Sequence, residues 1–197
     1  AYLKHYYPKE FMAALLTSVL DSSDKVSEYI GACLKMGIPV LPPDINESEQ
    51  GFTVTGDSIR FGLVAIKGIG YHLIDNVLSE RRHNGRFTSF SDFVERMTDK
   101  ELGKKSMASL IAAGAFDAMG KNRAQLLEVY ESVMDDAASS RRSNVEGQLN
   151  LFGELPEAVE PHYPDIPEMP LREKLNLEKA ATGFYLSGHP LSEYQAD

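Results

Sequence analysis

Apolar residues recur every three or four positions in several stretches of this chain, the spacing that places them on one face of an α-helix. A first helix is predicted to start at Pro8, because proline is tolerated in the first turn, with the apolar face Phe11, Leu15, Leu16 and Val19. A second begins after Ser22 or Ser23 and ends before Gly37, with the stripe Val26, Tyr29, Ile30, Cys33 and Leu34. The N-terminal part is therefore predicted to be helical.

The helical spacing stops after this point. Three prolines force residues 38–45 to run extended, because proline cannot continue a helix and restricts the residue before it. Apolar and polar residues then alternate in 52–55 and 59–61, on either side of Gly56-Asp57. This alternation is typical of a short β-hairpin, and it is the one sheet that the pattern predicts.

From Leu63 the helical spacing returns, so the middle of the chain is predicted to be mostly helical. Glycine and capping residues set the expected boundaries. The expected elements are a short helix from Leu63 to Ile66, a break at 67–70, a helix ending at Gly85, a helix at 90–97 capped by Ser89, a helix at 104–113 ending at Gly114, and a helix opened by a capping box at Asn122–Gln125.

Ser, Arg, Glu and Pro predominate from about Ser139 to Pro170, and periodicity is lost there. We interpret this stretch as a flexible linker with one apolar island at 148–152. A last helix is expected at 171–182 with Gly183 behind it, and 184–186 fit a strand of a following domain. The predicted fold class is mainly α.

The charge of the chain is unevenly distributed. The net charge is -9, which as an average argues against nucleic acid. Residues 60–123, however, carry 11 Lys or Arg against 7 Asp or Glu, a net charge of +4, whereas both flanks are acidic. Because charge acts within a Debye length of about 8–10 Å, the middle can still dock on a phosphate backbone.

Several classes of protein are disfavoured by composition. No apolar run reaches the roughly 18–20 residues that a membrane helix needs, and the N-terminal residues lack the pattern of a signal peptide, so we expect a cytoplasmic protein without a membrane partner. Cys33, the one cysteine, excludes an internal disulfide and a cysteine-based zinc cluster. The chain starts at Ala1, and we expect it to be part of something longer.

The break at 67–70 carries the candidate chemistry. In Leu63-x-x-Ile66-x-Gly68-Ile69-Gly70-x-x-x-Ile74, two short helices are joined by a glycine-apolar-glycine hairpin. Both glycines can take positive φ and admit a phosphate, which the N–H groups of the next helix would bind without reading bases. The predicted DNA-binding residues are Lys67, Gly68, Ile69, Gly70, Arg81 and Arg82, with Arg60 and Arg86 nearby.

Other interpretations of the glycine hairpin remain open. The glycines could simply make a turn between packed helices. A dinucleotide fingerprint fails because Leu73 stands where a third glycine belongs and no βαβ unit surrounds it. A looser second copy at 110–117, followed by Lys121 and Arg123, has one of the two glycines, and a structural role is as well supported there as a DNA contact.

No catalytic or metal-binding arrangement is evident. The carboxylates are scattered, and no paired aspartates indicate a two-metal site. The five histidines share no ligand spacing. We therefore predict no catalytic residue, no metal ligand and no cofactor within this chain.

The chain resembles the alpha subunits of bacterial DNA polymerase III, a family of replicative DNA polymerases, over essentially its whole length. The resemblance lies in distinctive strings: 1–4, 7–8, 10–14, 36–38, 41–46, 65–70, 114–117 and 183–191. It implies that 1–60 end the polymerase fingers, that 61–137 form a tandem helix-hairpin-helix DNA-binding domain, that 138–170 are the linker, and that 171–197 lead into an oligonucleotide-binding (OB) domain.

The resemblance also implies a function. The metal-binding aspartates of the family's palm lie upstream of this segment, so a DNA-directed DNA polymerase that uses magnesium would contain this chain as a non-catalytic part. Its partners would be duplex DNA, a sliding clamp and other replicase subunits. The island Gln148, Leu149, Asn150, Leu151 and Phe152 is similar to the family's clamp-binding peptide Q-L-x-L-F, with Gln148, Leu149, Leu151 and Phe152 as the binding residues.

Two competing functions remain. A stand-alone helix-hairpin-helix DNA-binding accessory module would be expected to have its own start and stop. An enzyme that holds a nucleotide in the glycine loop would bind nucleotides saturably, which a fluorescent-nucleotide titration would detect.

Overall fold

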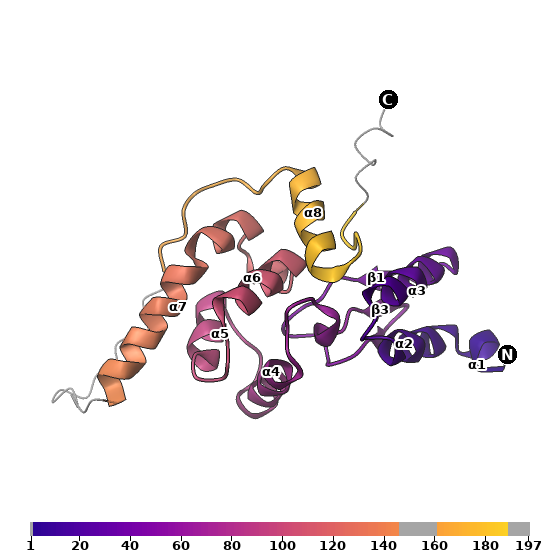
Figure 1. Cartoon of the computed structure of the whole chain (residues 1–197), viewed down its shortest axis with the longest axis horizontal. Helices are drawn as coiled ribbons and strands as arrows, with labels where there is room; N and C mark the ends of the chain where they lie inside the picture. Colours follow the sequence, from indigo (N-terminus) through magenta and orange to yellow (C-terminus); the bar gives the residue numbers. More distant parts are fainter. Residues whose placement is uncertain (1, 146–160, 189–197) are drawn as a thin grey trace.

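The structure, a computed structural model, describes residues 2–145 and 161–188. It is mainly helical with one small sheet, as the sequence predicts (Figure 1). The elements in chain order are α1 (Tyr2–Tyr6), α2 (Pro8–Ser18), α3 (Ser23–Lys35), β1 (Val40–Leu41), β2 (Thr53–Thr55), β3 (Ser58–Arg60), the 3-10 helix η1 (Leu63–Ala65), α4 (Tyr71–Asn84), α5 (Phe90–Met97), α6 (Lys104–Ala113), the 3-10 helix η2 (Asp117–Met119), α7 (Arg123–Val145) and α8 (Leu171–Thr182).

The N-terminal helices and the sheet form one end of the molecule, and α7 extends at the opposite end (Figure 1). The predicted hairpin exists as the antiparallel pair β2 and β3. The proline-rich segment adds a third strand that the sequence pattern did not predict, because β1 pairs in parallel with β3, with Val40 opposite Ile59. Thr17 on α2 accepts a hydrogen bond from the Phe52 amide at 3.0 Å and fastens the helix to the sheet.

Local capping explains why most helix boundaries agree with the prediction. Ser22 and Ser89 accept hydrogen bonds from backbone N–H groups in the first turns of α3 and α5. Gly114 and Gly183 end α6 and α8 in the left-handed region, at φ 87° and 84°. The expected capping box at the start of α7 is present, since Asn122 and Gln125 exchange side-chain to backbone hydrogen bonds.

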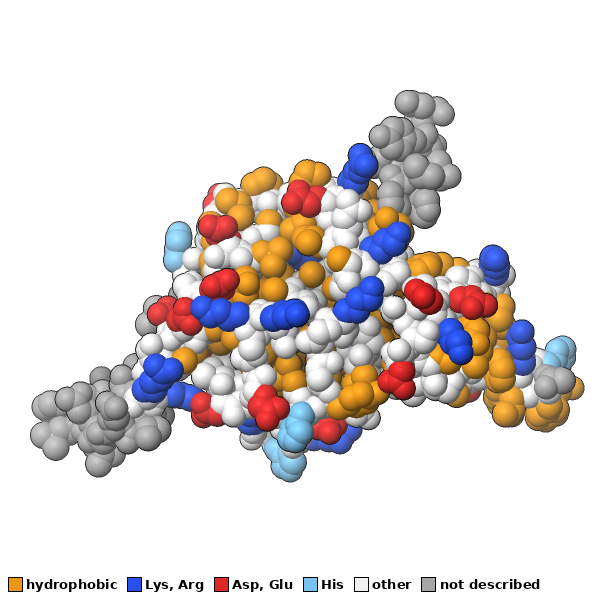
Figure 2. All heavy atoms as spheres, in the orientation of Figure 1, with side chains coloured by type: hydrophobic (Ala, Val, Ile, Leu, Met, Phe, Trp, Pro, Cys, Tyr) orange, Lys and Arg blue, Asp and Glu red, His pale blue; other side chains and the backbone are white. Residues whose placement is uncertain are grey.

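One continuous core joins the elements. Phe90 and Phe93 on α5 meet Phe116 edge to face, with ring centroids 5.1 and 5.0 Å apart, so α5 is packed on the segment between α6 and α7. Cys33 is buried, as its place in the apolar stripe predicts. Burial raises the pKa of its thiol to about 11 and outweighs the opposite effect of its backbone hydrogen bond. At the N-terminal end large apolar side chains remain exposed, including Tyr2, Leu3, Tyr6 and Tyr7, and hydrophobic atoms gather at that end in Figure 2.

Four features differ from the sequence-based expectation. Helix α1 was not predicted. Helix α7 continues to Val145, past the point at Ser139 where the change in composition predicted the linker to begin. Residues 161–170 lie along the start of α7 instead of standing free. Residues 184–186 are not a strand; the backbone amide of Leu186 donates to the Glu178 carboxylate. The apolar island 148–152 lies outside the described residues.

A cluster of charged side chains joins α4 to α5. The Glu80 carboxylate, whose side chain is 9% exposed, accepts hydrogen bonds from Arg96 at 2.9 Å, from Asn84 at 2.7 Å and from Lys100. These hydrogen bonds, that of Lys100 first, lower the pKa of Glu80 to about 2, although burial opposes them. Because the folded pKa lies below the ordinary value of 4.5, the cluster stabilises the folded chain at neutral pH.

Glu80→Gln should therefore lower the free energy of unfolding at pH 7 by about 2 kcal/mol, since Arg96 and Lys100 keep their charges without the carboxylate. Urea unfolding at several pH values measures this. Wild type should lose the contribution as the pH falls from about 4.5 towards 2. Glu95→Gln, at an exposed position on α5, is the matched control and should change little. Equal loss in both variants would contradict the assignment.

Candidate nucleic-acid interface

The first hairpin has the predicted geometry in its apolar part. Leu63 in η1, Ile66 and Ile74 in α4 are buried and lock the two short helical segments together. Ile69 is 9% exposed, so the residue between the two glycines also belongs to the core. The apolar residues thus anchor the turn between η1 and α4 in the core.

The two glycines have different roles. Gly68 has φ 80°, which agrees with the expectation and strongly favours glycine. Gly70 does not take a positive φ as expected; it has φ -83° and is the N-cap of α4. No side chain caps this helix end, and a Cβ at Gly70 would meet nothing within 4 Å. The first N–H groups of α4 therefore have no side-chain acceptor, and the space beside Gly70 is open.

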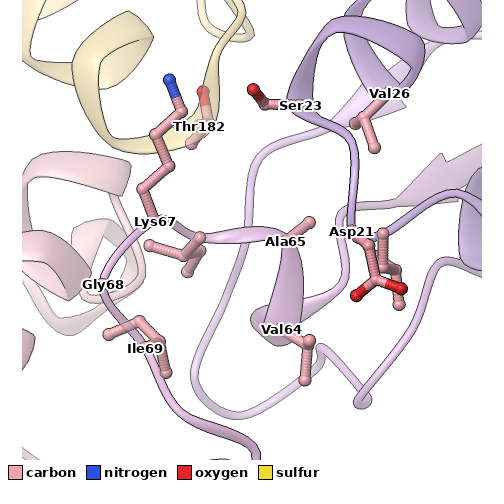
Figure 3. Close-up of a pocket in the computed structure, with 11 residues that line it drawn as sticks. Asp21, Ser23, Val26, Val64, Ala65, Lys67, Gly68, Ile69 and Thr182 are labelled. Carbon is pink, nitrogen blue, oxygen red and sulfur yellow. The ribbon is translucent and has the colours of Figure 1, made fainter.

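Neighbouring elements hold the hairpin from both sides. The Lys67 amide donates to the Ala181 carbonyl of α8 at 2.8 Å, and the Ser106 hydroxyl of α6 donates to the Gly68 carbonyl at 3.3 Å. The Lys67 side chain is exposed and points towards Thr182 in Figure 3. Both residues line a cavity of about 390 Å³. Among the described residues no carboxylate pairs with Lys67.

Arg81 and Arg82 do not lie beside the hairpin. They are in the last turn of α4, so at a rise of about 1.5 Å per residue they are roughly 16 Å from its start. Arg81, whose side chain is 10% exposed, donates to the carbonyls of Ile45 and Ser48 at 3.1 and 2.8 Å and pairs with Glu49. Arg81 therefore fixes the turn before β2. The Arg82 side chain also pairs with Glu49, but 67% of its surface remains exposed to solvent.

The other two arginines near the hairpin in sequence are also engaged. Arg60 donates to the Pro42 carbonyl at 2.9 Å, and its Nε is buried without a partner. Arg86 pairs with Glu47 at 2.5 Å. Positive side chains are consequently dispersed over the middle of the molecule between acidic ones, as Figure 2 shows for one face.

Two lysines beside the hairpin were missed by the sequence analysis. Lys104 and Lys105 are in the first turn of α6, next to the Ser106 that contacts Gly68. Lys104 pairs with Asp135 at 2.9 Å, and this hydrogen bond raises the pKa of Lys104. Lys105 is exposed. The signal that could have found them is a lysine pair after Gly103 at a helix start, but only tertiary packing brings that start to the hairpin.

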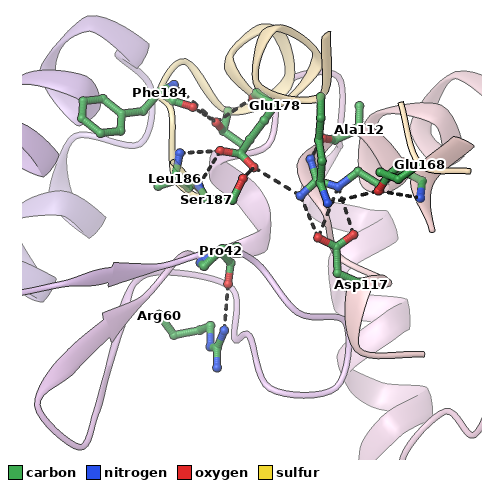
Figure 4. A network of polar contacts seen from close by, with 12 residues as sticks. Pro42, Arg60, Ala112, Asp117, Glu168, Glu178, Phe184, Leu186 and Ser187 are labelled. Carbon is green, nitrogen blue, oxygen red and sulfur yellow. Dashed lines mark hydrogen bonds and ion pairs between the residues drawn. The ribbon is translucent and has the colours of Figure 1, made fainter. Parts of the chain in front are cut away.

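The second hairpin is built differently. Gly114 has φ 87°, and a Cβ there would come within 2.3 Å of the Arg123 guanidinium. Arg123 is fully buried and contacts Asp117 at 2.7 Å, the Ala112 carbonyl at 2.9 Å and Glu178 at 3.2 Å (Figure 4). Burial alone would lower the pKa of Arg123, but the two carboxylates raise it. The Arg123 side chain therefore faces the protein interior.

Other kinds of site find no support in the described ranges. No group of three or more His, Cys, Asp or Glu side chains there is arranged to hold a metal ion. None of the helices in those ranges combines the length and apolarity that a membrane span requires.

Comparison with known proteins agrees with the hairpin geometry. Residues 37–126 match the model of a family described as the helix-hairpin-helix motif, so the fold and site define a helix-hairpin-helix region within this chain. Proteins named DNA polymerase III subunit alpha match nearly the whole chain: 44% identity over 199 residues in Deinococcus radiodurans, 43% over 196 in Thermus aquaticus and 40% over 198 in Mycobacterium tuberculosis H37Rv. The chain belongs to the DNA polymerase III alpha subunit family.

The matches cover 98–99% of this chain but only 15–17% of those relatives. The chain thus spans about one sixth of the length of the curated relatives it matches. The family resemblance inferred from the strings of the sequence is confirmed.

The role of Arg81 can be tested through stability. Arg81→Ala should lower the free energy of unfolding by about 2 kcal/mol, because two carbonyls and Glu49 lose a nearly buried charged donor. Arg82→Ala, on the same turn but exposed, should change it by less than about 0.5 kcal/mol. Thermal or urea unfolding of both variants measures the difference. Similar values for the two would show that Arg81 does not hold the turn.

Proposed function

We propose that this chain is the segment of a bacterial replicative DNA polymerase that holds duplex DNA through its phosphate backbone. The observation that carries the proposal is the first hairpin: Gly68 at positive φ, Gly70 as an uncapped and open helix start, and Lys67 exposed beside them. This arrangement offers donors and positive charge to one phosphate.

The binding mode follows from the donors. The free N–H groups at the start of α4 donate to phosphate oxygens, and the helix dipole and the Lys67 ammonium stabilise the negative charge. Lys105 and Arg82 add exposed charge at greater distance. None of these donors is positioned to read base edges, so binding is independent of sequence and weakens steeply with salt. Ile69 supports the hairpin from the core, and Arg81 supports α4 from its other end.

The proposed role of the whole protein is DNA-directed DNA synthesis with magnesium, with this segment as a non-catalytic part. The names of the relatives support the activity. Because the match continues far beyond the hairpin on both sides, a polymerase segment is better supported than a stand-alone helix-hairpin-helix accessory module.

A second part of the proposal concerns the island at 148–152. Gln148, Leu149, Leu151 and Phe152 form the peptide that attaches the polymerase to its sliding clamp. The support is the sequence alone: three large apolar residues among polar ones are favourable where a partner covers them. Other replicase subunits are further proposed partners.

DNA binding by the hairpin is tested most cleanly at Gly70. Gly70→Leu places a side chain in open space at an ordinary φ, so the fold should survive while the approach to the α4 N–H groups is blocked. We expect a five- to tenfold loss of affinity for a short duplex at low salt, measured by fluorescence anisotropy, which corresponds to about 1 kcal/mol.

Gly31→Leu is the control, because a Cβ at Gly31 in α3 also meets nothing within 4 Å. It should bind like wild type. If Gly70→Leu keeps its helical signal and its full affinity, the first hairpin is a packing device and the proposed function fails.

Clamp binding has its own test. Leu151→Ala with Phe152→Ala should abolish the micromolar binding of the chain to a bacterial sliding clamp, since these two residues are the proposed anchors. Asn150→Ala is the matched control and should bind like wild type. Equal clamp binding by wild type and double variant, or none by wild type, would refute this part of the proposal.

A further inference from the structure

The start of α7 already holds an anion. The backbone N–H groups of Arg123 and Ala124 donate to the two carboxylate oxygens of Glu168, at 3.3 and 3.1 Å. Arg123 and Ala124 are the first two residues of α7, as Tyr71 and His72 are the first two residues of α4. A carboxylate from the chain itself therefore accepts from the first N–H groups of α7 (Figure 4), whereas no side chain caps the start of α4.

The surroundings of Glu168 keep its charge. Its side chain is 28% exposed and forms an ion pair with Lys174 at 3.1 Å. Burial alone would raise the pKa of Glu168, but the hydrogen bonds from Lys174, Arg123 and Ala124 lower it. At neutral pH the group is a charged acceptor of two helix-terminal donors, the chemical role that a phosphate has at such a site.

Several contacts hold the segment that contains Glu168 against the start of α7. The Asn122 side chain donates to the Ile166 carbonyl and the Gln125 side chain donates to the Pro164 carbonyl, both at 2.9 Å. Lys121 lies over the ring of Tyr163 at 4.6 Å. The capping residues of α7 thus also hold the segment 161–170, which makes the carboxylate a fixed occupant.

We infer that the second hairpin is a backbone-phosphate site closed by the carboxylate of Glu168, so that removal of this charge opens a second anion site on α7. Contact with DNA is then confined to the first hairpin in the folded chain. The part of this inference that concerns DNA rests on the proposed function, whereas the anion site does not.

The anion site is tested with inorganic phosphate and Glu168→Ala. Titration followed by the amide resonances of Arg123 and Ala124 should give saturable shifts in the variant and none in wild type. Glu173→Ala, an exposed carboxylate on α8 removed with the same change of charge, is the control and should behave like wild type. No phosphate-dependent shift of the two amides in Glu168→Ala would overturn the inference.

The DNA part is tested with a short duplex. Glu168→Ala should gain about three- to tenfold in affinity, and the slope of log K against log salt should steepen by about one unit, as for one added phosphate contact. Glu173→Ala should change affinity by less than about twofold. Equal gains in the two variants would refute a specific site. If phosphate binds but no variant binds DNA, the proposed function fails and the anion site stands.

Glu168→Gln is a second variant that tests the anion site if Glu168→Ala does not fold. If Glu168→Ala loses helical signal in circular dichroism, Glu168→Gln replaces it, because the amide retains an oxygen for one N–H group but lacks the charge. Phosphate should then shift the same two amides with weaker affinity. Absence of that shift in a folded Glu168→Gln overturns the inference.

Discussion

The buried ion cluster around Arg123 is the interaction on which the C-terminal half depends. Its guanidinium joins the end of α6, the Asp117 carboxylate of η2 and Glu178 of α8, and Glu178 in turn accepts hydrogen bonds from Ser187. Two fully buried charges are tolerated only when their polar atoms have partners, and each side-chain nitrogen of Arg123 and each carboxylate oxygen of Glu178 has at least one here. Because Ala181 of α8 accepts the Lys67 amide, the same cluster indirectly fixes the first hairpin.

The two hairpins show how one motif can serve different ends. Both have a glycine at positive φ, Gly68 and Gly114, and both precede a helix start. In the first, the capping position is a glycine and the donors are left open. In the second, the Arg123 side chain points inward to Glu178, and the first N–H groups of α7 donate to the Glu168 carboxylate. These donors therefore bind another segment of the same chain. Side chains at the helix start, more than the turn itself, decide whether the first N–H groups of the helix are left open.

Much of the fold was predictable because its signals are local. The bounds of α5, α6 and α8 agree with the sequence since their caps lie within a few residues. The family was also recognisable from strings of residues. What failed depends on distant partners: the pairing of β1 with β3, the capture of Arg81 by carbonyls more than thirty positions away, and the contact of Glu168 with amides 44 and 45 positions away. Periodicity carries no information about such contacts.

The length of α7 sets a distance inside the protein. At about 1.5 Å per residue, its 23 residues make a rod of roughly 35 Å, and Lys104 and Asp99 brace it through ion pairs with Asp135 and Arg141. Val145, the last residue of α7, therefore lies far from the start of the helix at Arg123 (Figure 1). In mechanical terms α7 is a braced lever arm: a force applied at Val145 is transmitted to α5 and α6, on which the helix packs, before it reaches the first hairpin.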